Sequence, residues 1–322
     1  MTFEQLLQIL PQQLVFGIAL GSVYALIALG YTMVYGILFM INFAHGDVFM
    51  VGSFLGWGVL TTLIGARVIP VEPLIAVPLM LAVGALGCSI LGVSVEFFAY
   101  RPLYARGASR LGPLISAIGA SIFIQNFVMV TQGARQKVLP TEQLFPRTEE
   151  LVIGNTYVTV LVMLIVITSL VVMYALDRFV RTTRLGRAMR AVRENRQVAQ
   201  FMGVDINQVV SITFLIGSAI AGIGGVLVGL YYTQTDFYLG WYAGLKAFTA
   251  AVLGGIGNIR GAMLGGLVLG VIESLGIAVL SITGPLTGFG VAYKDLIAFA
   301  VLILVLVFRP TGILGEEVAE RL

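Results

Sequence analysis

The chain has 322 residues, of which 58% are hydrophobic and only 11% are charged, with a formal net charge of +3. Because a soluble globular domain usually carries about 25% charged residues, this composition excludes an ordinary soluble protein. It indicates a protein that crosses a membrane several times, and we expect no nucleic-acid partner. The single cysteine, Cys88, and the single histidine, His45, argue against disulfides and multi-histidine metal sites, so we expect no metal and no cofactor.

Long apolar runs divide the chain into predicted transmembrane helices. Each run is long enough to cross about 30 Å of hydrocarbon as a helix. The runs cover residues 14–38, 48–64, 73–99, 111–130, 158–176, 209–232, 262–282 and 296–308, and a shorter run covers 243–256. We therefore predict a single all-α membrane domain over residues 1–322, with about eight long transmembrane helices and one short or re-entrant helix.

The first polar interruption lies at residues 41–48, which read INFAHGDV. Asn42, His45 and Asp47 stand there between apolar segments, and a bilayer supplies no hydrogen-bond partners for them. One interpretation is a tight turn in which Asp47 caps the next helix. The other is a discontinuous helix that lines a transport path. The two are compatible, and we expect His45 to be structural.

A second polar group lies within the apolar run at 112–132, where Gln125 and Asn126 are expected at mid-span or slightly outward. Such amides are costly in a bilayer unless they bond to a neighbouring helix or to a solute. We keep both as candidates for the substrate path. The loop that follows, 133–155, carries mixed charge and is predicted to be the longest exported segment, where a solute-delivering partner would bind.

The segment 177–205 contains seven arginines and three acids, so it is predicted to be cytoplasmic. As a helix it is amphipathic, with Arg187, Arg190 and Arg193 on one side. The residues on the apolar side are Leu185, Ala188, Met189, Val192 and Ala199. This segment is either a basic loop that fixes topology and touches anionic lipid, or a docking surface for a cytoplasmic partner.

Arg196 falls on the apolar side of that helix, which predicts a break near Asn195 and two short helices. Gly203 is then expected to end the second helix, and Asp205 with Gln208 to cap the next span. With this segment inside, thirteen of the 19 Lys and Arg residues lie inside, and the first 66 residues contain none. The predicted topology therefore has the N-terminus outside and the C-terminus inside.

The glycine-rich run at 254–261, GGIGNIRG, lacks the Lys-Ser/Thr of a phosphate loop, and no Walker A sequence occurs in the chain. If transport is driven by ATP, the ATPase is therefore a separate chain. The other glycines at four-residue spacing, such as Gly17 with Gly21 and Gly52 with Gly56, are expected to let helices pack closely.

The chain resembles the integral-membrane permease subunit of branched-chain amino acid ABC importers over nearly its full length. The matching segments are 41–54 (INFAHGDVFMVGSF), 183–205 (TRLGRAMRAVRENRQVAQFMGVD), 254–266 (GGIGNIRGAMLGG) and 308–315 (FRPTGILG). The second is similar to the coupling loop of importer permeases, whose pattern is Glu-Ala-Ala, three residues, then Gly. Here those positions are Gln197, Val198, Ala199 and Gly203, so two of the four depart from the pattern.

The resemblance implies a non-enzymatic permease in the bacterial inner membrane. It implies a homologous second permease, two cytoplasmic ATPase subunits and a periplasmic substrate-binding protein as partners, with lipid around them. Similar permeases import urea, amides and other amino acids. The expected ATPase-coupling residues are Leu185, Arg187, Ala188, Met189, Arg190, Val192, Gln197, Ala199 and Gly203.

The apolar side of the amphipathic helix needs a groove, which an ATPase surface can supply; burial in the lipid interface is the competing interpretation. If the helix docks on an ATPase, Ala199→Leu and Gly203→Leu should leave the permease inserted but weaken that contact.

A self-sufficient secondary transporter is the alternative function, and a membrane enzyme is a third. A secondary transporter would be expected to use intramembrane carboxylates. The candidates Glu96, Asp236, Glu273 and Asp295 are predicted mostly near helix ends, where snorkelling or capping explains them. No nucleophile–base pair or pair of catalytic carboxylates stands out in the sequence.

Overall fold

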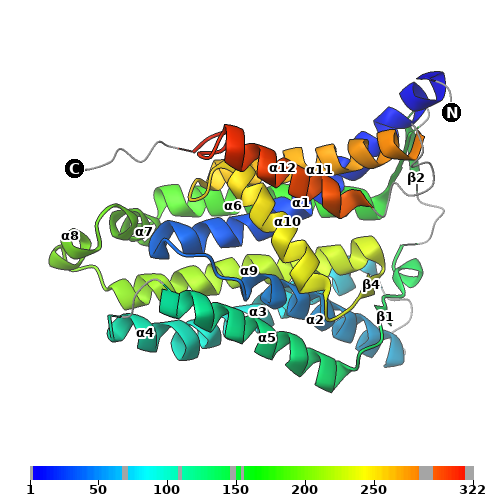
Figure 1. The fold of residues 1–322 in the computed structure, drawn as a ribbon. Coiled ribbons are helices and arrows are strands. Elements are labelled where there is room, and N and C mark those ends of the chain that lie inside the picture. The colour runs from blue at the N-terminus through cyan, green and yellow to red at the C-terminus, as the bar shows by residue number, and fades with distance from the viewer. Residues whose placement is uncertain are drawn as a thin grey trace.

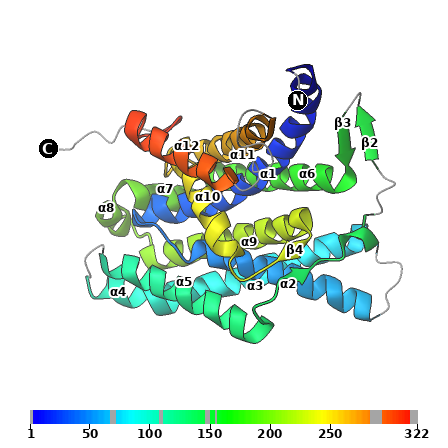
Figure 2. The ribbon, with the colours of Figure 1, turned by 45° about the vertical axis from the view of Figure 1, so that its right-hand side comes forward.

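The computed structural model describes residues 3–66, 72–107, 111–145, 150–153, 156–282 and 293–315. They form a bundle of helices, with α7 and α8 at one end and the short β-strands at the other (Figures 1 and 2). The helices are α1 (Phe3–Leu38), α2 (His45–Gly65), α3 (Pro73–Val95), α4 (Arg101–Ala105), α5 (Leu111–Gln132), α6 (Val160–Thr182), α7 (Arg184–Glu194), α8 (Arg196–Phe201), α9 (Ile206–Tyr232), α10 (Leu239–Gly254), α11 (Ile259–Ile282) and α12 (Lys294–Phe308).

Short elements complete the fold. A π-helical turn at Glu96–Tyr100 joins α3 to α4, and a 3-10 turn lies at Thr141–Gln143. The strands are β1 (Lys137–Val138), β2 (Glu150–Ile153), β3 (Thr156–Thr159) and β4 (Gln234–Thr235). They form two antiparallel pairs, β1 with β4 and β2 with β3, in which Lys137 faces Thr235 and Glu150 faces Thr159. Residues 146–149 and 154–155 of the predicted exported loop lie outside the described residues.

Seven helices in the described part of the chain are long and apolar enough to cross a membrane, which confirms the predicted α-helical bundle. They are Gln8–Leu38, His45–Gly65, Pro73–Tyr104, Leu111–Gln132, Val160–Thr182, Ile206–Tyr232 and Ile259–Leu280. The predicted short run lies in α10, which has 16 residues. The last predicted span lies in α12, whose described length is 15 residues.

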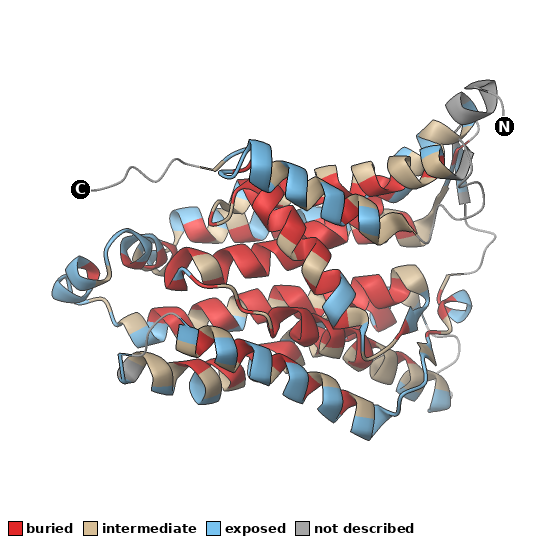
Figure 3. Ribbon diagram, in the orientation of Figure 1, coloured by how far each residue is buried: buried red, intermediate tan, exposed pale blue. Residues whose placement is uncertain are grey.

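The centre of the bundle is built by α1 and α9. In their most apolar windows 78% and 67% of the residues are buried, against 22% in α5, so α5 lies at the periphery (Figure 3). Glycines allow the close contacts of the central helices. A Cβ on Gly17 of α1 would lie 2.8 Å from Val271 Cα of α11, and a Cβ on Gly52 of α2 would lie 2.7 Å from Gly222 Cα of α9. The glycines thus act in packing, as their spacing indicates.

Candidate functional site

Two helices, α2 and α10, begin inside the bundle at the same place. A Cβ on Gly46 would lie 3.1 Å from Gly244 Cα, and a Cβ on Gly240 would lie 2.9 Å from Asp47 Cα, so the two N-terminal turns touch through their backbones. From this junction α2 runs toward the strand-bearing end and α10 toward the end that carries α7 (Figure 1). We call this meeting point the junction. Two positive helix ends therefore converge within the bundle.

The turn before α2 is closed by Asn42, which is buried. Its side-chain oxygen accepts hydrogen bonds from the backbone N–H of Ala44 at 3.1 Å and from the hydroxyl of Tyr100 at 2.8 Å. The predicted tight turn is therefore present. Asp47 does not cap α2, contrary to our expectation, because the helix already begins at His45 and places Asp47 in its first turn.

Asp47 is buried, and its carboxylate accepts a hydrogen bond of 2.5 Å from the hydroxyl of Ser121 on α5. Tyr31 of α1 completes the surroundings, since its hydroxyl would lie 3.1 Å from a Cβ on Gly244. The junction thus presents a carboxylate, two hydroxyl groups and two helix N-termini.

His45 is wedged between α1 and α2. Its ring meets the ring of Tyr31 edge-on, with the centroids 4.9 Å apart. The ring lies against Gly30, where any side chain would collide with it. These contacts favour the structural interpretation of His45.

The amides of α5 are placed differently from Ser121. The buried face of α5 carries Ser121, Ile124 and Val128. Gln125 is half-buried, while Asn126 is exposed and donates only to the carbonyl of Ile122 in its own helix, at 2.8 Å. Asn126 therefore points away from the junction. The polar residue of α5 that reaches the junction is Ser121, which was not among the predicted path residues. Its helical spacing with Ala117, Ile124 and Val128 could have indicated that it lies on the buried face.

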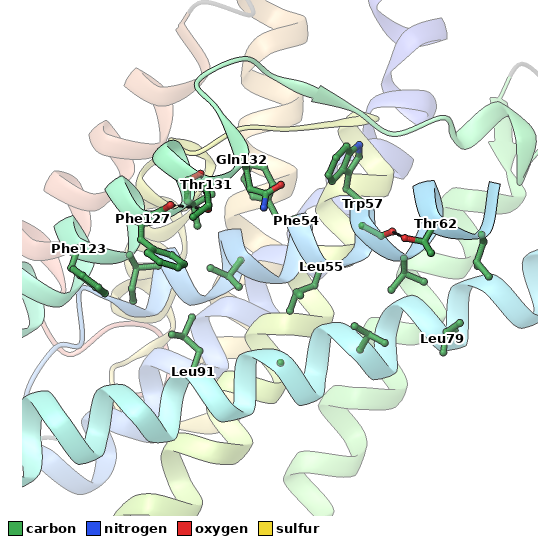
Figure 4. Close-up of a pocket in the computed structure, with 18 residues that line it drawn as sticks. Phe54, Leu55, Trp57, Thr62, Leu79, Leu91, Phe123, Phe127, Thr131 and Gln132 are labelled. Atoms are coloured by element: carbon green, nitrogen blue, oxygen red, sulfur yellow. Dashed lines mark hydrogen bonds between the residues drawn. The ribbon is translucent and has the colours of Figure 1, made fainter. Parts of the chain in front are cut away.

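An apolar groove of about 790 Å³ starts next to the junction and runs between α2, α3 and α5 (Figure 4). Its lining includes Val51 and Ile124, about one helical turn from Asp47 and Ser121. Apolar side chains such as Leu55, Leu91 and Phe127 line most of it. Its polar lining residues are Trp57, Thr62, Thr131 and Gln132. The ring of Trp57 lies 5.2 Å from the ammonium nitrogen of Lys137 in β1, which places this part of the groove near the strands.

The predicted cytoplasmic segment forms two short helices broken at Asn195, as expected. The side chain of Thr183 accepts from Gly186 N–H at 3.0 Å and caps α7, and that of Asn195 accepts from Val198 N–H at 3.1 Å and caps α8. Gly203 has φ +83° after α8. Asp205 then accepts from Gln208 N–H at 3.2 Å and caps α9. The local predictions for this segment are confirmed.

Most of the apolar stripe of this segment is covered by the chain itself. Met189, Val192 and Ala199 are buried in the core of the bundle, with Val192 fully covered. Our expectation that the stripe needs an external groove is therefore wrong for these three residues. The helix α7 packs against α1, α6 and α9, and α8, which carries Ala199, packs against α7 and α9. Of the remaining predicted coupling residues, Leu185 and Ala188 are half-buried, and Arg187, Arg190, Gln197 and Gly203 are exposed.

The opposite side of α8 and the residue that follows it carry three exposed apolar residues, none of which was among the predicted coupling residues. Val198 is 55% exposed, Phe201 88% and Met202 80%. We call these three residues the α8 tip; Figure 3 shows that α8 projects from the end of the bundle. Their spacing of three and four residues places them on one face of a helix, and this was the available signal.

Two carboxylates expected near helix ends are in fact buried inside the bundle. Glu273 is fully covered, accepts from the ammonium of Lys246 at 2.7 Å and from Tyr24 at 3.1 Å, and Lys246 also lies 2.7 Å from Asp295. Lys246 is itself buried.

Glu96 is also buried and binds the guanidinium of Arg101 with both oxygens, at 3.1 and 2.8 Å. Snorkelling therefore explains neither Glu96 nor Glu273, and both carboxylates have a cationic partner. Asp236 does act as expected, because its side chain accepts from Tyr238 N–H at 2.8 Å before α10.

A helical membrane bundle in which two helices begin internally, beside an apolar groove, belongs to the class of membrane transport proteins. The described residues contain no group of three or more His, Cys, Asp or Glu that could hold a metal ion. The chain belongs to the family described as branched-chain amino acid transport system / permease component, whose model matches residues 13–306. The resemblance seen in the sequence is thereby confirmed, and the family consists of transport components, not enzymes.

Named relatives agree with this assignment. The chain is 47% identical over 317 residues to the high-affinity branched-chain amino acid transport system permease protein BraD of Pseudomonas aeruginosa, covering 96% of this chain and 97% of that protein. It is 45% identical over 327 residues to the permease protein LivH of Escherichia coli, covering 99% of each.

A different permease also matches in part. The probable branched-chain amino acid transport permease protein LivM of Methanocaldococcus jannaschii is 33% identical over 146 residues, covering 42% of this chain and 41% of that protein. No solved structure matches the chain.

Proposed function

We propose that this chain is the membrane-spanning permease subunit of an ATP-driven importer that carries branched-chain or other amino acids across the bacterial inner membrane. The observation that carries the proposal is the junction of α2 and α10 beside the apolar groove, in a chain that belongs to this permease family. The proposed partners are a homologous second permease, two ATPase subunits and a periplasmic substrate-binding protein.

The junction offers a complementary group for each part of an amino acid. The N-terminal ends of α2 and α10 suit the α-carboxylate. The Asp47 carboxylate suits the α-ammonium group. The groove that begins at Val51 and Ile124 suits an aliphatic side chain, because its walls are almost entirely apolar. Leucine, isoleucine and valine fit this combination.

The orientation follows from the arginines. The end that carries α7 and α8 is proposed to be cytoplasmic and the strand-bearing end periplasmic. The N-terminus is then outside and the C-terminus inside. Cysteine labels at positions 190 and 106 should be protected from an impermeant reagent added outside, and a label at position 147, outside the described residues, should react. Labelling of position 190 from outside would reverse the orientation.

The α8 tip is proposed to dock on the ATPase. Three exposed apolar residues, two in α8 and one directly after it, form a compact face that an apolar groove of a partner can bury. Such anchors carry most of the energy of an interface. The exposure of Val198, Phe201 and Met202 supports a contact there, whereas the stripe of α7 is buried within this chain.

One experiment separates the proposal from its alternative. Proteoliposomes that contain this chain, the second permease, the ATPase subunits and the binding protein should take up labelled leucine only when ATP is available to the ATPase subunits. A proton uncoupler should leave uptake unchanged. Uptake that needs an ion gradient and no ATP would instead support a secondary transporter.

A further inference from the structure

Three arginines of the cytoplasmic segment bind backbone carbonyls of three different parts of the bundle. Arg190 donates to the carbonyl of Val180 in the last turn of α6. Arg193 donates to the carbonyl of Gly257 at 2.7 Å, and Arg196 to that of Ile37 in the last turn of α1 at 3.1 Å. Carbonyls at helix C-termini lack a partner within the helix, and a cation there also complements the helix dipole.

The contact of Arg193 differs from the other two in what it reaches. Gly257 lies in the loop that joins α10 to α11, and α10 is the helix whose other end forms the junction. The left-handed φ of +91° at Gly257 is open to glycine and strained for other residues. A Cβ there would also lie only 3.4 Å from the Arg193 guanidinium.

The side chains between α7 and the bundle leave a small gap. The hydrogen bond from Arg193 to Gly257 crosses this gap and links α7 to the loop after α10. A small cavity of about 50 Å³ lies between α7 and the bundle, and Met33, Met189 and Gly257 are among the residues that line it. Arg193 also lines the cavity and crosses to the Gly257 carbonyl. Charge-assisted hydrogen bonds of this kind are stronger than neutral ones.

The end of α10 is stiffened by a second contact. The carbonyls of Leu253 and Gly254 accept from the backbone N–H groups of Ile313 and Leu314, at 2.8 and 3.0 Å. The side chain of Asn258 donates to the Leu314 carbonyl at 2.8 Å. The glycine-rich motif 254–261 and the motif 308–315 therefore form one unit at the cytoplasmic end of α10.

We propose that Arg193 is a positioning residue that links the docking helices α7 and α8 to α10, so that a displacement of α8 moves the junction. The link runs from the α8 tip through Arg193 and Gly257 along α10 to Gly240, which touches the first turn of α2. This inference rests on the proposed function, since it assumes that the ATPase binds the α8 tip and that the solute passes the junction.

The test is Arg193→Met in the reconstituted transporter, compared with Arg184→Met. The second substitution removes the same charge from the same helix, but Arg184 is exposed in the first turn of α7 and is not one of the predicted coupling residues. We expect Arg193→Met to retain the ATPase subunits and ATP hydrolysis while the leucine transported per ATP falls about tenfold. Arg184→Met should leave that ratio unchanged.

Arg193→Lys keeps a cationic donor and should recover much of the leucine transported per ATP. The same variant is used for the test if Arg193→Met does not fold. In that case Arg193→Lys is compared with Arg193→Gln, and a ratio in Arg193→Lys no higher than that in Arg193→Gln overturns the inference. An unchanged ratio in Arg193→Met, or a fall of the same size in Arg184→Met, would overturn the inference. Failure of the proposed docking is seen separately, as full ATPase retention in a variant with an altered α8 tip.

Discussion

The junction and the segment 177–205, proposed as the cytoplasmic docking segment, use polar and apolar groups in opposite ways. At the junction the informative residues are buried polar ones, Asp47 with Ser121 and Asn42 with Tyr100, each held by hydrogen bonds. In the docking segment the informative residues are exposed apolar ones, Phe201 and Met202. We expect functional residues among those that lie in an environment their chemistry disfavours, because a solute can still bind a buried polar group and a partner can still cover an exposed apolar one.

The largest effect is expected at the junction. Asp47→Asn keeps the size of the side chain and an acceptor for the Ser121 hydroxyl, so the bundle should fold, but it removes the charge proposed to hold the ammonium group of the solute. We expect ATP-dependent leucine uptake to fall at least about thirtyfold. Uptake in proteoliposomes is the measurement, with Ser121→Ala as the comparison for the lost hydrogen bond. Normal uptake by Asp47→Asn would contradict the proposal that Asp47 binds the ammonium group of the solute.

The second largest effect is expected at the α8 tip. Phe201→Asp places a charge in the centre of the proposed ATPase contact and should weaken retention of the ATPase subunits about thirtyfold. The permease itself should be unaffected, because Phe201 is 88% exposed. Retention is measured by pull-down across a range of ATPase concentrations. Gln200→Asp, exposed in the same helix, is the control, and equal losses in both variants would point to a general effect of added negative charge.

Ala199→Leu separates the two sides of α8. Because Ala199 is buried in this chain's own core, the added side chain should destabilise the permease by about 1–3 kcal/mol, in contrast to the sequence-based expectation of a specific docking defect. Thermal unfolding in detergent measures this loss. A stable Ala199→Leu permease that fails to retain the ATPase would restore the original interpretation of Ala199 as a docking residue.

The smallest effect is expected at Gly203. A Cβ there meets no atom within 4 Å, but φ is +83°. The backbone conformation, and not a lack of space, therefore limits the substitution. Gly203→Leu should lower the free energy of unfolding by about 1–2 kcal/mol. Gly203→Asn should cost less, since Asn tolerates this conformation better. Thermal unfolding of the two variants checks the order, and equal stabilities would contradict it.

Local features of the docking segment could be predicted from the sequence. The break at Asn195, the end at Gly203 and the cap at Asp205 depend on residues within four positions, so their side-chain chemistry decides them. The apolar runs likewise predicted the helical bundle, since hydrocarbon leaves few choices for the backbone.

Contacts between distant segments could not be predicted in the same way. The burial of Val192, the pairing of Lys246 with Glu273 and the bond between Asp47 and Ser121 each depend on how helices far apart in the chain pack. An amphipathic pattern shows that a face will be covered but does not show by what. For this reason the apolar face of α7 was assigned to a partner when the bundle itself covers it.

The most direct test of the account is the reactivity of a cysteine at the junction. In a Cys88→Ala background, Ser121→Cys places a thiol beside Asp47, and Asn126→Cys places one on the opposite, exposed face of the same helix. With the assembled transporter and a small methanethiosulfonate reagent, leucine should slow the modification of position 121 and leave position 126 unchanged. Equal modification of position 121 with and without leucine, in a transporter that still imports it, would contradict a path through the junction.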